Sequence, residues 1–527
     1  MLDLLHGLAT GDLTDRSAVL WTWVAATGTV RIELQREQGQ DSPPVRLLEP
    51  SGSGPRKWLL QDLEPATAYR VRVTTAEGRK GEGHFRTLPS PEASVPIRFG
   101  VTGDWSQDLQ PYVAIADVPR RDLAFMVALG DTVYGDAPSL TTFKDAETYT
   151  DYVGRHRESL TPRHGRDTWQ AVRASTGTFA MIDDHEVFND FAGGAWIRED
   201  GRTIRMARGR RYRAGVSAFE DMMPLWPERW EPGSAGEIAG LPRLYRQRRL
   251  GKDAMLAMVD GRTFRTAPVA KVKTFDPLGW AGYLLQAGRP GRTMLGEAQM
   301  ARLREDLLVA ERDGVHWKFV LVPVPVQNLG LIGAGDRYEG WPEERLDLLR
   351  FLRDARIRHV VFIGADHHGT LVNEVDGARQ LGSLPPELTP IEILTGPAGV
   401  DHLLGERLLH TAKVAGFLGQ SVQQRLQRAS MRTKDELMLQ LIDMQLRAQG
   451  LDPIGLDPAL GRLESGTWGL GHSYTWTEFD VAGPRLTVTV RGVARYTAEA
   501  MTRAPDSLVQ QEPRILARFT IGDPGAR

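Results

Sequence analysis

Aspartates follow most of the candidate strands in the middle of the chain, and this pattern limits the fold more than any other feature. Six apolar runs alternate there with segments of helical periodicity, which is typical of a layered α/β domain. Five of the six are followed within a residue or two by an acid, at Asp104, Asp131, Asp183 with Asp184, Asp260 and Asp366. The carboxyl ends of neighbouring strands meet at one edge of a sheet, and carboxylates gathered there repel one another unless a cation lies between them. The pattern therefore predicts a metal site at a sheet edge.

The secondary structure expected for this region follows from its periodicity. Helices are expected at Glu297–Arg312 and Glu343–Arg356, because each segment has apolar residues three to four positions apart along one stripe. The six candidate strands are Ile97–Gly103, Leu123–Gly130, Thr178–Ile182, Met255–Val259, His316–Pro323 and Arg358–Gly364.

Composition divides the chain into four parts. Residues 1–92 consist of short alternating runs separated by Gly, Pro and Ser clusters, which predicts an all-β sandwich of the immunoglobulin or fibronectin kind. Residues 93–404 carry the layered α/β pattern, and residues 466–527 return to strands that would complete the same domain. Residues 405–465 predict a helical insertion, with helices at Ser421–Arg428 and Glu436–Leu446. The insertion would serve as a lid, a partner-binding arm or an oligomer contact.

Composition also excludes several classes of chemistry. Cysteine is absent from the 527 residues, which excludes disulfides, thiolate zinc sites, iron–sulfur clusters and cysteine nucleophiles. The 65 basic and 67 acidic residues give a net charge of −2, so no overall field favours nucleic acid or an anionic membrane. One arginine cluster could suggest a polyanionic partner, but we favour a solvated helix face; its members are Arg198, Arg202, Arg205, Arg208, Arg210, Arg211 and Arg213.

The sequence shows no feature of membrane insertion. No apolar run reaches the roughly 18 residues that cross a membrane, and the first residues lack the basic and apolar regions of a signal peptide. We therefore expect no transmembrane segment and, by default, a cytoplasmic location. An exported protein whose signal had been removed would look the same, so that alternative stays open.

Two motifs combine metal-ligating oxygens with a second functional group. In Gly130-Asp131-Thr132-Val133-Tyr134, the aspartate can bridge two cations and the tyrosine can reach the same site as a phenolate, while a structural Gly-Asp turn is the alternative. In Asp183-Asp184-His185-Glu186, an aspartate ligand stands beside a histidine that can donate a proton. The alternative is a helix start capped by one of the two aspartates, with Glu186 in the first turn.

Two further motifs follow strand ends. In Asp366-His367-His368, the first and last residues offer a carboxylate oxygen and an imidazole nitrogen to neighbouring cations, while His367 would fill a polar turn. Asp104 follows the first strand of the α/β region, where a solitary aspartate is usually a turn residue. Asp104 is nevertheless the first of four acidic strand ends in chain order, and a dinuclear site requires such a set. The other three are Asp131, Asp184 and Asp366.

The order of these motifs resembles the calcineurin-like metallophosphoesterases, and within them the PhoD-like alkaline phosphatase family. The resemblance covers nearly the whole chain. The segments that carry it are Leu5–Asp12 with Leu20-Trp21-Thr22, Gly130–Tyr134, Asp183–Val187, Asp260–Arg265, Leu295–Gln299, Gly340–Arg345 and Ala365–His368. The resemblance implies an αββα metallophosphoesterase sandwich, and a metal-dependent phosphoric ester hydrolase that acts on monoesters, diesters or both.

The resemblance also implies which residues hold the metals. The first metal would be Fe³⁺, and the all-oxygen second site suits Ca²⁺, Mn²⁺ or Mg²⁺ better than Zn²⁺. Asp131 would bridge both metals, with Asp104, Tyr134 and His368 on the first metal and Asp184 and Asp366 on the second.

The same resemblance implies a mechanism. A hydroxide held by both metals would attack phosphorus, and His185 would protonate the leaving alkoxide. Arg262 or Arg265 would hold a phosphate oxygen, with a surface ion pair as the alternative for both. The partner implied is therefore a phosphate-ester substrate.

The sequence departs from its relatives at two points, which leaves a competing hypothesis. Relatives commonly supply a cysteine to the first metal where this chain has Asp104, and Gln327 and Asn328 follow Phe319–Val326 in place of a ligand histidine. Water or one of those amides would then complete the second metal. The competing hypothesis is a non-catalytic metal-binding or surface-assembly protein that keeps the fold, and the presence of every acid together with His185 argues against it.

Overall fold

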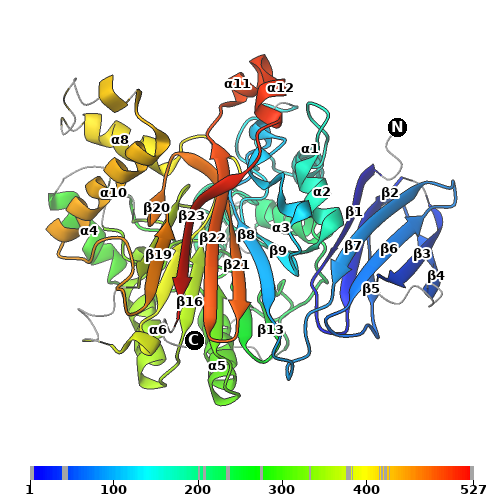
Figure 1. Cartoon of the computed structure of the whole chain (residues 1–527), viewed down its shortest axis with the longest axis horizontal. Coiled ribbons are helices and arrows are strands. Elements are labelled where there is room, and N and C mark those ends of the chain that lie inside the picture. Colours follow the sequence, from blue (N-terminus) through cyan, green and yellow to red (C-terminus); the bar gives the residue numbers. More distant parts are fainter. Residues whose placement is uncertain are drawn as a thin grey trace.

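The computed structural model contains two large β-sheets packed against each other, with helices around them and a smaller sheet beside them (Figure 1). It describes residues 5–25, 27–37, 45–139, 141–199, 202–205, 209–232, 238–272, 277–330, 334–375, 382, 384–414, 416, 419, 424–426 and 428–522.

The larger sheet joins segments from the two ends and the middle of the chain. Three strands at its centre, β8, β9 and β10, run parallel, and β21 lies antiparallel beside β8. In spatial order its strands are β19 (Gly461–Ser465), β23 (Arg514–Ile521), β22 (Arg485–Ala494), β21 (Ser473–Ala482), β8 (Ile97–Thr102), β9 (Phe125–Leu129), β10 (Gly177–Met181), β1 (Leu5–Gly11), β2 (Ala18–Val24) and β5 (Gly54–Leu60).

The N-terminal strands form a β-sandwich that shares this sheet. β1 continues the sheet beyond β10, where Gly11 pairs with Thr178. Buried side chains of β2 and β3, such as Leu20 and Ile32, meet in one cluster. The second layer of the sandwich consists of β4 (Val45–Ser51), β3 (Gly28–Arg36), β6 (Ala68–Thr74) and β7 (Lys80–Arg86). The predicted β-sandwich is confirmed, whereas the domain boundaries at 92, 404 and 465 stay predictions.

The second large sheet faces the first. Its strands β14, β15, β16 and β18 run parallel, as the alternation of apolar runs and helices predicts. In spatial order its strands are β13 (Arg246–Leu250), β14 (Ala254–Met258), β15 (Trp317–Leu321), β16 (Val360–Gly364), β18 (Ile391–Leu394), β17 (Thr370–Glu374) and β20 (Gly469–Leu470).

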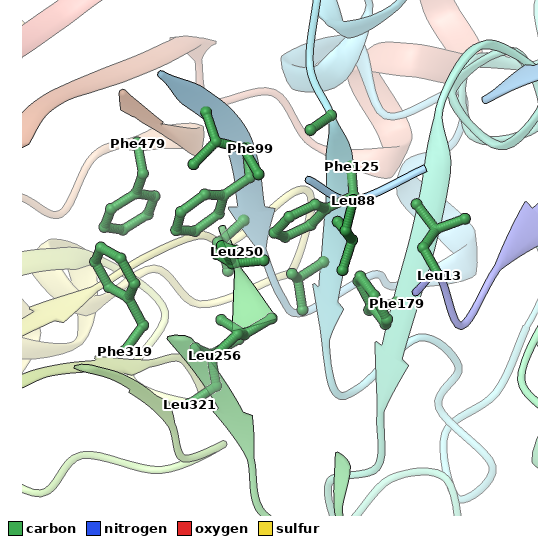
Figure 2. Close-up of a cluster of buried hydrophobic side chains, with 14 of the residues drawn as sticks. Leu13, Leu88, Phe99, Phe125, Phe179, Leu250, Leu256, Phe319, Leu321 and Phe479 are labelled. Carbon is green, nitrogen blue, oxygen red and sulfur yellow. The ribbon is translucent and has the colours of Figure 1, made fainter. Parts of the chain in front are cut away.

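Aromatic side chains fill the space between the two large sheets. Phe99 stacks against Phe125 and Phe479, with ring centroids 5.0 and 4.9 Å away, and it meets Phe319 of the opposite sheet edge to face at 5.3 Å (Figure 2). Aromatic pairs at such separations stabilise a core by about 0.5–1.5 kcal/mol each beyond the area that they bury. This packing holds the two sheets together, so their strand ends share one edge of the molecule.

Helices cover the outer faces of both sheets. α5 (Glu297–Arg312) and α6 (Pro342–Asp354) pack on the second sheet through Leu307 and Leu349, and α2 (Thr168–Ser175) and α3 (Arg210–Met222) pack on the first through Val172 and Met222. The αββα layering predicted for the chain is thereby confirmed. Further elements are the hairpin β11 (Trp196–Glu199) and β12 (Arg202–Arg205), and helices α1 (Tyr149–Ser159), α4 (Pro277–Ala287), α11 (Ala498–Arg503) and α12 (Pro505–Val509).

The helical insertion contains α8 (Leu404–Val414) and α10 (Met431–Ala448), which meet through buried Leu404 and Met438. Within the helix predicted at Ser421–Arg428, residues 424–426 and 428 are described and are helical, and the other four lie outside the described residues. In the arginine cluster, the side chains at 198, 202, 205 and 208 are likewise outside the description, and Arg210 and Arg213 are exposed on α3. Among the described residues, no helix combines the length and apolar character needed to cross a membrane.

Candidate metal centre

The acidic strand ends of both sheets meet at one edge, as the sequence predicts. Asp131 and the Asp183–Asp184 pair follow β9 and β10 of the first sheet, and Asp366 follows β16 of the second. Ligand atoms of Asp131, Asp183, Asp184 and Asp366 all lie within 4.8 Å of one another. Asp131 and Asp184 form a second such group with His185. The edge therefore carries enough oxygen ligands for more than one cation.

The turns after three strands share an unusual backbone conformation. The φ angle is 59° at Asp104, 50° at Asp131, 60° at Asp366 and 57° at His368, all in the left-handed region. A residue other than glycine held there costs on the order of 1–3 kcal/mol, and such strain concentrates at functional sites. The same sharp turn thus follows strands of both sheets and presents acids at their common edge.

The predicted ligands of the first metal are also close together. His368 Nε2 lies 4.0 Å from Asp104 Oδ1, and His368 Nδ1 donates a hydrogen bond to the His402 carbonyl at 3.2 Å. Burial, and next the charge of Arg407, lowers the pKa of His368 to about 3. The imidazole is therefore neutral, which is the form that binds metals. Tyr134 is buried in the same region, with its ring 4.2 Å from that of His185.

Four buried oxygens of the predicted ligands fit a role in holding cations. Among the described residues, Oδ2 of Asp104, Oδ2 of Asp131, Oη of Tyr134 and Oδ1 of Asp184 have no hydrogen-bond partner, although Arg262 Nη2 lies 3.5 Å from the last of these oxygens. A buried polar atom without a partner costs about 1–3 kcal/mol, and more when it is charged. These oxygens are hard ligands of the kind that Fe³⁺, Ca²⁺, Mn²⁺ and Mg²⁺ bind, so the donor set fits the predicted metals.

The acids repel one another in the absence of cations. Burial, and next the charge of Asp366, raises the pKa of Asp104, while burial, and next Asp184, raises the pKa of Asp131. The same two causes as for Asp131 raise the pKa of Asp366 to about 6. Each ionised group thus needs a nearby positive charge, which a bound cation supplies.

Glu186 fixes the loops that carry the acids. Its Oε2 accepts hydrogen bonds from the N–H groups of Asp131 at 3.2 Å and Asp183 at 2.8 Å, and its Oε1 accepts from the N–H and the hydroxyl of Thr132, each at 2.6 Å. Residues 183–190 contain no helix and have turns at 185–187 and 189–190, so the alternative of a capped helix start is wrong. Gly130, with φ at 91°, lets the two loops approach, because a Cβ there would lie 2.6 Å from the Cβ of Asp183.

His185 is held at the edge of the acid cluster by a further aspartate. Its Nδ1 donates to Asp136 Oδ1 at 2.6 Å, and Asp136 Oδ2 accepts the Asn189 N–H at 2.6 Å. Burial lowers the pKa of His185, but Asp184 and Asp136 outweigh burial and raise it to about 9. Since Nδ1 is occupied, Nε2 is the atom available for proton transfer.

Arg262 and Arg265 are buried beside the acids, so the alternative of a surface ion pair is wrong. Arg262 donates to Asp183 through Nε and to Asp336 Oδ2 through Nη1 at 2.8 Å, and its Nη2 lies 3.5 Å from Asp184 Oδ1. Arg265 donates to Asp336 Oδ1 at 2.6 Å. Neither guanidinium side chain has exposed surface. A direct contact of either with phosphate stays a prediction.

Three further aspartates lie in this region, of which one was expected from the sequence and two were not. Asp260, the fifth acidic strand end, accepts the N–H of Thr263 at 2.8 Å and so stabilises its own loop. Asp190 and Asp336 form a third acid group with Asp184, although Lys271 Nζ already lies 2.7 Å from Asp190 Oδ1. An amide ligand from Gln327 or Asn328 stays a prediction.

Comparisons with known proteins relate this site to phosphatases. The family model of PhoD-like phosphatases matches residues 103–448, well over half of the chain and the part that contains every predicted site residue. The chain belongs to the PhoD-like phosphatase family. Alkaline phosphatase D of Bacillus subtilis (strain 168) is 24% identical over 403 residues, which make up 69% of this chain and 64% of that protein. The chain thus aligns with somewhat less than two thirds of this relative's length.

Two solved structures superpose on nearly the whole of this chain. A structure of PhoD superposes with a TM-score of 0.70 at 18% identity, covering 98% of this chain and 90% of that one. The purple acid phosphatase PPD1 from yellow lupin (Lupinus luteus) seeds superposes with a TM-score of 0.51 at 13% identity, covering 98% of this chain and 73% of that one. The predicted metallophosphoesterase fold is confirmed.

Proposed function

We propose that this member of the PhoD-like phosphatase family hydrolyses phosphoric esters, monoesters, diesters or both, at the acidic sheet edge. The observation that carries the proposal is the set of four buried ligand oxygens from Asp104, Asp131, Tyr134 and Asp184 that accept no hydrogen bond from any described residue. Buried acids that repel one another require cations, and paired cations are suited to phosphate chemistry.

The residues divide into two metal sites that share Asp131. Asp104, Tyr134 and His368 would hold the first metal, which their phenol and imidazole suit to Fe³⁺. Asp184 and Asp366 would hold the second, with Asp183 close enough to assist, and carboxylates suit Ca²⁺, Mn²⁺ or Mg²⁺. When bound, the two cations would lower the pKa of the attacking water and neutralise charge on the phosphate.

His185 would act as the general acid. Asp136 holds its Nδ1 at 2.6 Å, which fixes the ring and leaves Nε2 to give a proton to the departing alkoxide. The short contact with Tyr134, at a ring separation of 4.2 Å, limits rotation of the imidazole further.

Arg262 and Arg265 would act mainly by positioning the acids. Both are buried and paired with Asp336, so a direct contact with phosphate would require these pairs to open. Arg262 also pairs with Asp183 and lies near Asp184, and it would thereby set the spacing of the second metal's ligands.

The proposal is tested by phosphate ester hydrolysis before and after metal removal. Protein purified without chelators is assayed with p-nitrophenyl phosphate and bis-p-nitrophenyl phosphate, treated with chelator, and reloaded separately with Fe, Mn, Ca and Zn. We expect hydrolysis that disappears on chelation and returns on reloading, and the ratio of the two rates gives the monoester or diester preference. Absence of hydrolysis of either ester with every metal would contradict the proposal and favour a non-catalytic assembly protein.

A further inference from the structure

Arg407 presents a free guanidinium beside the proposed metal centre. It lies in the first turn of α8, in the helical insertion, and it is exposed. Its side chain makes no hydrogen bond or ion pair with any other residue in the part of the chain that the structure describes. Its sequence neighbour differs, because Glu406 pairs with Arg495 at 2.9 Å.

The start of α8 is tied to the loop that carries His368. The Leu404 N–H donates to the His368 carbonyl at 2.9 Å, and His368 Nδ1 donates to the His402 carbonyl at 3.2 Å. Residues three apart lie next to each other on a helix surface, so Arg407 rises from the same face as Leu404. The guanidinium therefore starts one helical turn from the loop of a predicted metal ligand.

The charge of Arg407 acts on the acids of the site. Partial desolvation by the surrounding protein lowers the pKa of this arginine, while the charges of Asp366 and Asp104 raise it. These charge effects agree with the position of Arg407 in the first turn of α8, which the Leu404 N–H ties to the carbonyl of the predicted ligand His368.

The other cations near the acids already have partners. Arg262 and Arg265 pair with Asp336 and have no exposed surface, and Lys271 pairs with Asp190 at 2.7 Å. A phosphate that arrives from solvent does not reach the two buried arginines in this structure. Arg407 combines exposure, freedom from a protein partner among the described residues, and proximity to the site.

We propose that Arg407 binds the phosphate group of the substrate ester, and then the released phosphate, through two N–H groups of its guanidinium. The inference rests on the proposed function and adds a substrate-binding residue to it. A guanidinium fork matches two oxygens of one phosphate, and a free one beside a metal centre can bind them without breaking an ion pair. The helical insertion would thus contribute a residue to substrate binding.

The test compares Arg407→Ala and Arg407→Lys with Lys413→Ala, a control at an exposed cation on the same helix. Each metal-loaded variant is assayed for kcat and KM with p-nitrophenyl phosphate, for metal content, and for binding of inorganic phosphate by calorimetry. For Arg407→Ala we expect KM and the Kd of phosphate to rise about 10- to 100-fold, as for a lost charged hydrogen bond. Metal content should stay unchanged, and Arg407→Lys should retain part of the affinity because it keeps the charge without the fork. Lys413→Ala should match the unsubstituted protein.

Three outcomes would overturn the inference. KM and phosphate affinity of Arg407→Ala within about twofold of the unsubstituted protein would show that the guanidinium touches no phosphate. A loss of metal in that variant would place its role in the metal centre, and an equal loss of affinity in Lys413→Ala would show a general effect of the helix. If the unsubstituted protein hydrolyses no ester, the proposed function fails, and the calorimetry with inorganic phosphate still decides the role of Arg407.

Discussion

Replacing Glu186 with glutamine perturbs the site without replacing a predicted metal ligand. The substitution keeps the shape of the side chain but turns one of its two oxygens into an NH₂ group. One end of the carboxylate accepts from Thr132, at 2.6 Å to both the N–H and the hydroxyl, and the other accepts from the N–H groups of Asp131 and Asp183 at 3.2 and 2.8 Å. Whichever end becomes NH₂, at least one buried backbone N–H loses its acceptor.

The expected cost follows from these hydrogen bonds. A buried donor without an acceptor costs about 1–3 kcal/mol. When the NH₂ group faces Thr132, only the Thr132 N–H loses its acceptor, because the hydroxyl can rotate to accept from the NH₂ group, so we expect a loss of about 1–3 kcal/mol. With an unfolding entropy of about 2.1 cal/mol/K per residue, this corresponds to a melting temperature lower by about 1–3 °C if the chain unfolds as one unit.

The assay is thermal unfolding of chelator-treated protein, because bound metal would add its own stabilisation. Glu305→Gln is the matched control, since the Glu305 side chain is 67% exposed and its partner Arg302 is 3.8 Å away. The control should melt within about 0.5 °C of the unsubstituted protein, as expected of a weak surface pair. Equal melting temperatures for Glu186→Gln and its control would refute the reasoning that this carboxylate holds the loops.

Three other substitutions distinguish residues that act in turnover from a residue that is needed for metal binding. His185→Ala should keep the metals and lose most turnover, with a larger loss for alkyl phosphates than for p-nitrophenyl phosphate; an unchanged rate with alkyl phosphates would remove His185 from the mechanism. Asp136→Ala should lower kcat by about 10- to 100-fold with metal content unchanged, because the imidazole loses its orienting partner, and steady-state kinetics with an unaltered kcat would exclude that role. Gly130→Ala should lower metal content measured after dialysis, because the new Cβ would lie 2.6 Å from the Cβ of Asp183, whereas Gly314→Ala, also at positive φ but in open space, should bind metal normally. Full metal content in Gly130→Ala would show that the two loops tolerate separation.

The acidic strand ends could be predicted from the sequence because their signal is local. An apolar run ending in an aspartate is visible within ten residues, and parallel strands bring such ends together in any layered α/β fold. The backbone is left-handed at Asp104, Asp131 and Asp366, so the same kind of turn follows three strands. The pattern of an apolar run followed by an aspartate was therefore sufficient to predict the site.

The residues that support those acids could not be predicted in the same way. Glu186 was visible beside His185, but its partners at 131 and 132 lie in the loop of another strand. The pairing of Arg262 with Asp336 spans 74 residues, and Asp336 follows no strand, so nothing local distinguished a buried pair from a surface one. Arg407 is an ordinary helix arginine in sequence, and only the attachment of α8 to the loop of a predicted ligand brings it to the site.

The most direct test of the account is the metal content of protein purified without chelators, measured by elemental mass spectrometry beside Asp131→Asn. The account predicts about two metals per chain, one of them iron, and the loss of both in the variant, because one carboxylate serves both cations. Little or no metal after incubation with Fe, Mn, Ca and Zn, or full occupancy in Asp131→Asn, would contradict it.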